Sequence, residues 1–133
     1  MLKFIKYEIE AVAKPRMTKA DKWKKRKCVT RYRAYKDEVR KQKIQVPESG
    51  AWIIFVLAMP DSWSNKKKKA YFGTPHQQRP DKDNLEKGLL DALFEEDSHV
   101  WDGRTSKIWG YTHNIIIQQY SIDETDFSTM LAA

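Results

Sequence analysis

Apolar and polar residues alternate or cluster in patterns that are each typical of one kind of element. Residues 2–10 mostly alternate between the two, which predicts a half-buried β-strand. Residues 51–59 form a continuous apolar run, which predicts a strand in the middle of a sheet. Residues 100–109 and 111–120, joined around Gly110, predict two more strands, the second of them rich in β-branched residues.

Helical periodicity appears in two segments of the first half of the chain. Residues 30–43 place Tyr32, Tyr35 and Val39 at spacings of three and four, which predicts a helix with these side chains on its inner face. A short basic helix made mostly of lysines is predicted further on, with Ser64 near its N-cap.

A third helix is predicted after Pro80, because proline biases the residue before it towards an extended conformation. Asp83 is a suitable N-cap, and Glu86 three residues later completes a capping-box pattern. Leucines recur every four residues at 85, 89 and 93, which predicts a buried stripe. The opposite face carries charged residues with the same spacing, namely Asp83, Lys87 and Asp91.

These elements predict an α+β fold, in which a small mixed sheet is covered by two or more helices. The chain has 133 residues, which is the length of one domain with one modest core. Residues 1–120 are expected to form this single domain. Residues 121–133 are expected to be a short, mildly acidic and partly disordered tail.

Charge is distributed unevenly along the chain, which carries 25 basic and 18 acidic side chains and a formal charge of +7. Residues 1–45 hold 16 basic and 5 acidic side chains, whereas residues 81–133 hold 4 and 11. A basic front half and an acidic back half fit a protein that binds a polyanion with one surface and a metal ion with another. A solvated basic face remains an equal alternative on charge alone.

Basic residues in two segments are the candidate phosphate contacts, because lysine and arginine near aromatic rings suit a nucleic acid. One segment precedes and enters the first predicted helix, and the other is the lysine run, which is also explained by a solvated face. The candidates are Lys14, Arg16, Lys22, Lys24, Lys25, Arg26, Lys27, Lys66, Lys67, Lys68 and Lys69.

The single cysteine, Cys28, excludes an internal disulfide and agrees with a reducing cytoplasm. Residues 1–12 lack the apolar core of a secretory signal, and the longest apolar run, of nine residues, is too short to cross a bilayer. We therefore expect a cytoplasmic protein without a membrane partner.

Acidic residues gather around the third predicted helix. Asp81 and Asp83 stand at its start, where acids commonly cap a helix and suit its dipole. The run Glu95-Glu96-Asp97 follows the helix, at a point where the chain must turn and can return to the same neighbourhood. Oxygen ligands crowded at one place are typical of a Mg²⁺ site, so capping and metal binding are both open.

The residues around this helix and two upstream segments also follow a family pattern: Pro80-Asp81-x-Asp83-Asn84-Leu85-x-Lys87 with Asp91-Ala92-Leu93 and Glu96-Asp97-Ser98-x-Val100, Lys14-Pro15-Arg16-Met17-Thr18, and Met59-Pro60-x-Ser62-Trp63-Ser64 with Thr74-Pro75-His76. The pattern resembles that of the RusA family of Holliday-junction resolvases over roughly residues 1–120. These are small Mg²⁺-dependent endodeoxyribonucleases, often carried by phages and prophages. The chain has Glu96 where the family commonly has aspartate, and His99 where the family has glutamine.

The resemblance implies that Asp81, Asp83, Lys87 and Asp97 carry catalysis. The three aspartates would hold Mg²⁺, for which Mn²⁺ would substitute. It further implies a homodimer acting on branched DNA, the four-way junction, with paired symmetric nicks in recombination and repair in a bacterial or phage-infected cell. His76 is interpreted as a loop residue or substrate contact rather than a metal ligand.

Two other functions remain open. One is a nucleic-acid-binding protein without catalysis, whose acids only cap a helix. The other is a metal-dependent nuclease for other branched DNA.

Overall fold

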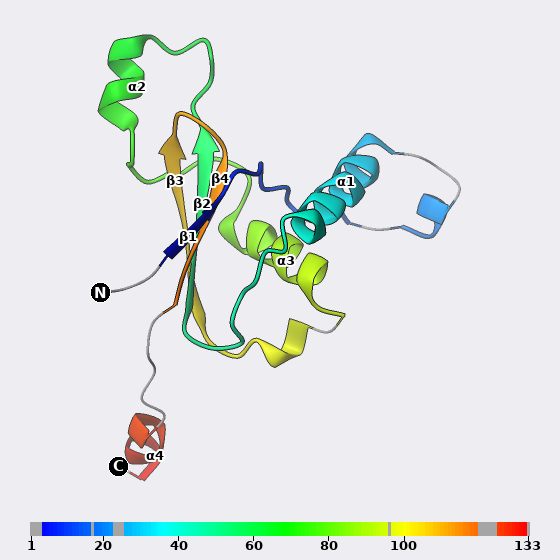
Figure 1. The fold of residues 1–133 in the computed structure, drawn as a ribbon, viewed down its shortest axis with the longest axis vertical. Coiled ribbons are helices and arrows are strands. Elements are labelled where there is room, and N and C mark those ends of the chain that lie inside the picture. The colour runs from blue at the N-terminus through cyan, green and yellow to red at the C-terminus, as the bar shows by residue number, and fades with distance from the viewer. Residues whose placement is uncertain (1–3, 17, 23–25, 96, 120–124, 133) are drawn as a thin grey trace.

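Four strands form one mixed sheet, with the order β1-β4-β2-β3. They are β1 (Phe4–Tyr7), β2 (Ala51–Ala58), β3 (Gly103–Gly110) and β4 (Asn114–Gln119). β2 pairs parallel with β3 and antiparallel with β4, and β4 pairs antiparallel with β1. The apolar run therefore lies inside the sheet, as predicted (Figure 1). This computed structural model describes residues 4–16, 18–22, 26–95, 97–119 and 125–132.

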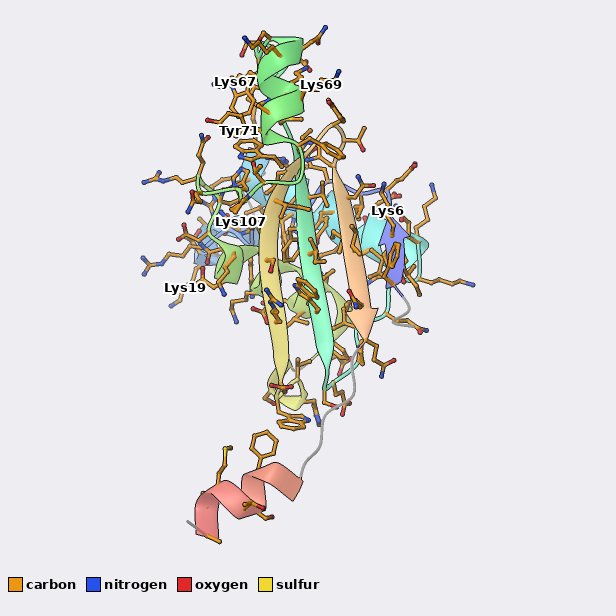
Figure 2. All side chains as sticks on the ribbon, turned by 90° about the vertical axis from the view of Figure 1, so that its left-hand side faces the viewer. Lys6, Lys19, Lys67, Lys69, Tyr71 and Lys107 are labelled. Carbon is orange, nitrogen blue, oxygen red and sulfur yellow. The ribbon has the colours of Figure 1, made fainter. Side chains whose placement is uncertain are left out.

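Helices α1 (Lys27–Lys41) and α3 (Lys82–Leu93) lie together on one face of the sheet, whereas α2 (Asn65–Tyr71) extends beyond the sheet's end (Figures 1 and 2). Short 3₁₀ turns, η1 (Lys19–Lys22) and η2 (Asp97–His99), precede α1 and follow α3. The predicted α+β class, with a small mixed sheet and more than one covering helix, is confirmed.

The core lies between the sheet and the two covering helices. Phe55 of β2 and Ile115 of β4 are fully buried there, and they belong to one cluster with Leu85 and Leu89 of α3. The inner face predicted for α1 is also confirmed, because Tyr32, Tyr35 and Val39 are all buried in this cluster. Burial of these side chains from two strands and two helices stabilises the sheet-helix arrangement and fixes where α3 lies.

Gly88 allows the chain at residues 12–14 to cross closely over α3. A Cβ at Gly88 would lie 2.6 Å from the carbonyl oxygen of Val12 and 3.2 Å from the amide nitrogen of Lys14. The Tyr32 hydroxyl donates to the Gly88 carbonyl at 2.8 Å, and burial raises the pKa of Tyr32 to about 12, so the donor stays protonated. Gly88 thus joins α1, α3 and the crossing segment.

Gly88→Ala is expected to destabilise the protein by about 1–3 kcal/mol, because the added methyl group meets backbone atoms that cannot move independently. An alanine at an unobstructed helix position would instead stabilise by roughly 1 kcal/mol, so the sign of the change is diagnostic. Urea unfolding measures the free energy of both proteins. An unchanged or raised free energy of unfolding would contradict the close crossing.

Several predicted element boundaries differ from the observed ones, including the starts of β3 and β4, which lie three residues later than predicted. β1 covers only Phe4–Tyr7 and is not half-buried, because this edge strand pairs with β4 alone and leaves Phe4 and Ile5 63% and 57% exposed. α1 begins at Lys27, three residues before the predicted start. Part of the expected tail is helical, since α4 spans Thr125–Ala132.

The two C-terminal strands are consecutive in sequence but are not neighbours in the sheet. β2 lies between them and pairs with both along its length. The parallel strands β2 and β3 are connected by a segment that contains α2 and α3. The acidic helix is thus part of a crossover between two parallel strands, where it must lie against the sheet.

Candidate active site

The first turn of α3 holds both motif aspartates, but the predicted cap is wrong. Asp81 is the N-cap residue, and its carbonyl oxygen accepts the Leu85 amide at 3.1 Å. Asp83 lies inside the first turn, so a capping box from Asp83 to Glu86 does not form. The helix starts earlier than predicted, because Asp81 is the only extended residue between Pro80 and the first helical residue, Lys82.

Neither aspartate carboxylate is consumed by capping. The Asp81 side chain makes no capping hydrogen bond, and both Asp81 and Asp83 are exposed. Among the described residues, neither carboxylate is in a hydrogen bond or an ion pair with another side chain. The sequence left capping and metal binding as alternatives. Because neither carboxylate caps the helix, both are free to bind a ligand such as a metal ion.

A cleft opens beside Asp81 between the start of α3, the start of α1 and residues 10–13. It has a volume of about 670 Å³, and Asp81 and Asn84 line it together with two cations, Arg31 and Arg79. Arg31 also donates to Glu10 at 2.7 Å across the cleft. Carboxylates and guanidinium groups thus share one concave surface, which suits a bound phosphate and a cation together.

Sequence reasoning missed Arg31 and Arg79 as lining residues of this cleft. Arg79 could have been found, because it stands two residues before Asp81 and Pro80 fixes its direction. Arg31 could not, because only the packing of α1 against α3 brings it there.

Lys107 of β3 holds the segment that leads into α3. Its ammonium donates to the carbonyl oxygens of Gln78 and Pro80, both at 2.6 Å. Burial lowers the pKa of Lys107, whereas the nearby Asp81 charge acts in the opposite direction. Lys107 therefore faces the acidic start of α3, and its ammonium fixes the segment that leads to Asp81.

Lys107→Met is expected to lower the cleavage rate about tenfold, because the segment before Asp81 loses both ammonium contacts and the carboxylate is less well positioned. Methionine retains the apolar stem. Single-turnover cleavage of labelled DNA measures the effect, and Lys6→Met on the exposed edge strand β1 serves as the charge-matched control. Equal rates for Lys107→Met and the wild type would show that these contacts do not position the site.

Lys87 lies one turn beyond Asp83 on α3, and its side chain is 57% exposed. Its ammonium is 3.9 Å from the Asp91 carboxylate, which also accepts from Lys14 at 2.5 Å. Lys87, Lys14 and Asp91 line a second, smaller groove of about 340 Å³ together with Lys36 of α1. Asp91 thus brings two candidate residues, Lys14 and Lys87, to the same side of α3.

Asp97 follows the carboxyl end of α3, at the start of η2 (Figure 1). Asp81 and Asp83 lie at the other end of this twelve-residue helix, which is about 18 Å long. The Asp97 side chain and Glu96 lie outside the described residues. Asp97 therefore remains a predicted ligand, and the described part of the site consists of the two aspartates at the start of α3.

The predicted phosphate contacts form two groups. Arg16, Lys27 and the lysines of α2 are surface residues. Figure 1 shows η1 and α2 on opposite sides of the sheet and α3. Lys24, Lys25 and the side chain of Lys22 lie outside the described residues. DNA contacts by all these residues stay predictions.

Arg26, another predicted contact, has a structural partner. It donates to both carboxylate oxygens of Asp21, at 2.7 and 2.8 Å, and to the Arg16 carbonyl at 2.9 Å. These contacts hold the pKa of Asp21 well below its usual range. Arg26 thus ties η1 to the start of α1.

His76 lies in the loop between α2 and α3, which is one of the two interpretations made from the sequence. It is buried, and its ring lies 4.1 Å from the ring of Trp109 in β3. Its amide donates to the Lys107 carbonyl at 3.0 Å, so the residue fastens the approach segment to the edge of the sheet. Burial and the Lys107 charge lower the pKa of His76.

The donor chemistry at the start of α3 suits magnesium. Mg²⁺ takes oxygen ligands and is commonly bound by one or two carboxylates, with water and substrate phosphate completing its shell. Asp81 and Asp83 supply two exposed carboxylates at the start of α3, and Asp81 lines a cleft that also carries arginine. Within the described residues, no group of three His, Cys, Asp or Glu side chains could hold a metal ion. A two-carboxylate site with open positions fits these residues.

The fold is an α+β domain. Its site combines two exposed aspartates with a cleft lined by cations, which suits an enzyme that binds a phosphate group through a metal ion. The model of the endodeoxyribonuclease RusA family matches residues 6–118. The chain therefore belongs to the RusA family of endodeoxyribonucleases, as its motifs indicated, and is a DNA-binding nuclease. No match was found among the curated proteins. Within the described residues, none of the helices has the length and apolarity needed to span a lipid bilayer.

Proposed function

We propose that this protein is a Mg²⁺-dependent endonuclease that resolves four-way DNA junctions in recombination and repair. The observation that carries the proposal is the pair of exposed carboxylates at the start of α3, of which Asp81 lines a cleft together with Arg31 and Arg79 and Asp83 follows two residues later. Membership of the RusA family supports the junction as substrate. Mn²⁺ is proposed as a substitute for Mg²⁺. Asp97 stays a ligand predicted from the family resemblance, since α3 separates it from Asp81 and Asp83 within one chain.

The chemistry is hydrolysis of a phosphodiester, in which a water oxygen attacks phosphorus and the bond to the 3′-oxygen breaks. Mg²⁺ bound to the aspartates would neutralise the phosphate, lower the pKa of a bound water and stabilise the leaving oxygen. Asp81 and Asp83 would position the metal ion, because the start of α3 fixes the backbone of both residues. Arg79 enters the same cleft and supplies charge-assisted hydrogen bonds to a phosphate oxygen.

Lys87 is proposed to stabilise negative charge on the phosphate in the transition state. Asp91 holds Lys87 and Lys14 on the same side of α3, and Lys87 lies one helical turn beyond Asp83. A cation that is already in position does not need to reorganise as charge develops. Such preorganised electrostatic stabilisation is usually the largest single contribution to catalysis.

A homodimer is proposed because the junction has two strands to cut in symmetric positions. A C₂ dimer presents two copies of one site, related in the same way as the two scissile phosphates. Light scattering at several protein concentrations would test it, with a mass of about 31 kDa expected for two chains of 15.7 kDa each. A constant monomer mass on junction DNA would contradict paired nicking by one assembly. The dimer is proposed to act in the cytoplasm of a bacterial or phage-infected cell.

A panel of DNA substrates tests the junction specificity. The cleavage rate is measured on a four-way junction, a three-way junction, a flap and a linear duplex of the same arm sequences. We expect the four-way junction to be cut fastest, in two strands. Faster cleavage of flaps or three-way junctions would instead support a nuclease for other branched DNA, and binding without cleavage of any substrate would support a binding protein.

A further inference from the structure

Aromatic side chains around α2 fall into two groups, of which the first packs α2 against β3. Trp63 lies between Tyr71 and Trp109, with ring centroids 5.2 and 4.9 Å away. The Lys67 ammonium lies 4.1 Å from the Trp63 ring centroid. Together with His76 against Trp109, this group connects the exposed helix α2 to the end of β3.

The second group is the pair Phe72 and Tyr111, which we call the aromatic pair. Phe72 follows α2 directly, and Tyr111 lies in the turn between β3 and β4. Their rings are stacked, with centroids 4.9 Å apart and planes 26° from parallel. They are 57% and 53% exposed, and neither belongs to the core cluster of buried residues. Two large flat rings are thus held side by side at the surface.

The charge around the aromatic pair identifies the chemistry of its partner. Lys66, Lys67, Lys68 and Lys69 form most of α2, the helix that ends next to Phe72. Figure 2 shows α2 extending past the end of the sheet, with Lys67 and Lys69 on different sides of the helix. Rings that stack on bases, together with ammonium groups that attract phosphates, are the combination found in surfaces for unpaired nucleic acid. A purely apolar protein partner would not match this charge.

The aromatic pair is linked to the aspartate pair by an ordered segment. Residues 73–80 run beside β3, where the Gly73 amide donates to Trp109, the Trp109 amide to Thr74, and the His76 amide to Lys107, at 2.9–3.0 Å. The ammonium of Lys107 holds the end of the segment next to Asp81. Eight residues lie between Phe72 and Asp81, so nine Cα–Cα steps limit the distance between them to at most about 30 Å, or about nine steps of B-DNA.

We propose that Phe72 and Tyr111 form a stacking site for an unstacked base at the branch point of junction DNA, while the lysines of α2 bind the adjoining phosphates. The inference rests on the proposed junction specificity and adds a physical basis for it. Linear duplex offers no free base face, whereas bases at a branch point lose a stacking neighbour at low cost. The segment 73–80 then sets a fixed range between the branch point and the cut phosphate.

The test compares binding by cleavage-deficient proteins, all carrying Asp83→Asn, to a four-way junction and to linear duplex in EDTA. Adding Phe72→Ala and Tyr111→Ala is expected to weaken junction binding by about tenfold to a hundredfold and duplex binding by less than about twofold. Phe127→Ala, at an exposed ring in α4, is the matched control and should change neither affinity. Phe72→Leu with Tyr111→Leu keeps apolar bulk without a flat ring, and should reproduce the loss if the alanine protein does not fold.

The salt dependence separates the two parts of the surface. The aromatic substitutions should leave the slope of log K against log salt unchanged, whereas Lys66→Ala and Lys69→Ala should each lower it by about 0.9 for each phosphate that the protein no longer neutralises. Junction preference that survives both aromatic double variants would overturn the stacking site alone. A parent protein that binds junction and duplex equally would contradict the proposed junction specificity, and the stacking site with it.

Discussion

Asp83→Asn is expected to lower the single-turnover cleavage rate by about a thousandfold or more and to leave junction binding within about twofold of the wild type. Asparagine keeps the size and helical position of the side chain but removes the charge that would hold a divalent cation. Metal-derived stabilisation of the transition state amounts to several kcal/mol, and each 1.36 kcal/mol corresponds to a factor of about ten in rate. Asp81→Asn should behave in the same way, because both carboxylates lie at the same turn of α3.

The structure explains why binding should survive this change. Neither carboxylate caps α3 or holds another described side chain, so the loss of one charge removes no structural contact. Glu86→Gln on the same helix is the control for a lost charge, and its cleavage rate should match the wild type. Loss of binding in parallel with cleavage would contradict a metal-binding role and would indicate that the aspartates stabilise the DNA-binding surface.

Lys87→Ala is expected to lower the cleavage rate by about a hundredfold, with a change in the free energy of unfolding below about 0.5 kcal/mol. An exposed i,i+4 ion pair contributes only about 0.3–0.5 kcal/mol to a helix, so the contact with Asp91 predicts a small effect on stability and none on rate. A cation that acts on the developing charge predicts a large effect on rate. The two roles of Lys87 therefore differ in what they change.

Cleavage and urea unfolding measured on the same protein separate these roles. Lys82→Ala, at an exposed lysine in the first turn of α3, is the control and should retain the wild-type rate. Lys87→Arg should restore part of the rate, because it keeps the charge at this position. An unchanged rate in Lys87→Ala, whatever its stability, would remove Lys87 from the catalytic site.

Local patterns in the sequence were sufficient for most of the elements that surround the site. The apolar run at residues 51–59 predicted an interior strand, and the leucines spaced four apart predicted the buried face of α3, because both signals depend only on periodicity. The cap of α3 was mispredicted, since Asp81 and Asp83 are equally good N-cap residues and the sequence does not say which begins the helix.

Contacts between distant segments could not be predicted in the same way. The Lys14–Asp91 ion pair joins residues 77 positions apart, and it exists only because Gly88 lets the crossing segment approach α3. The place of β2 between β3 and β4 likewise follows from the crossover through α2 and α3 rather than from any strand pattern. Phe72 and Tyr111 likewise meet only because the chain after α2 returns to the end of β3, where the Gly73 amide donates to the Trp109 carbonyl.

The most direct test of a metal-dependent junction nuclease is cleavage of a four-way junction labelled on two opposite strands, measured with increasing Mg²⁺ and with EDTA. We expect nicks at symmetric positions in both strands, a rate that rises with Mg²⁺, restoration by Mn²⁺, and no cleavage in EDTA. Cleavage that persists in EDTA, or tight binding without nicks under either divalent ion, would contradict a metal-dependent site at Asp81 and Asp83.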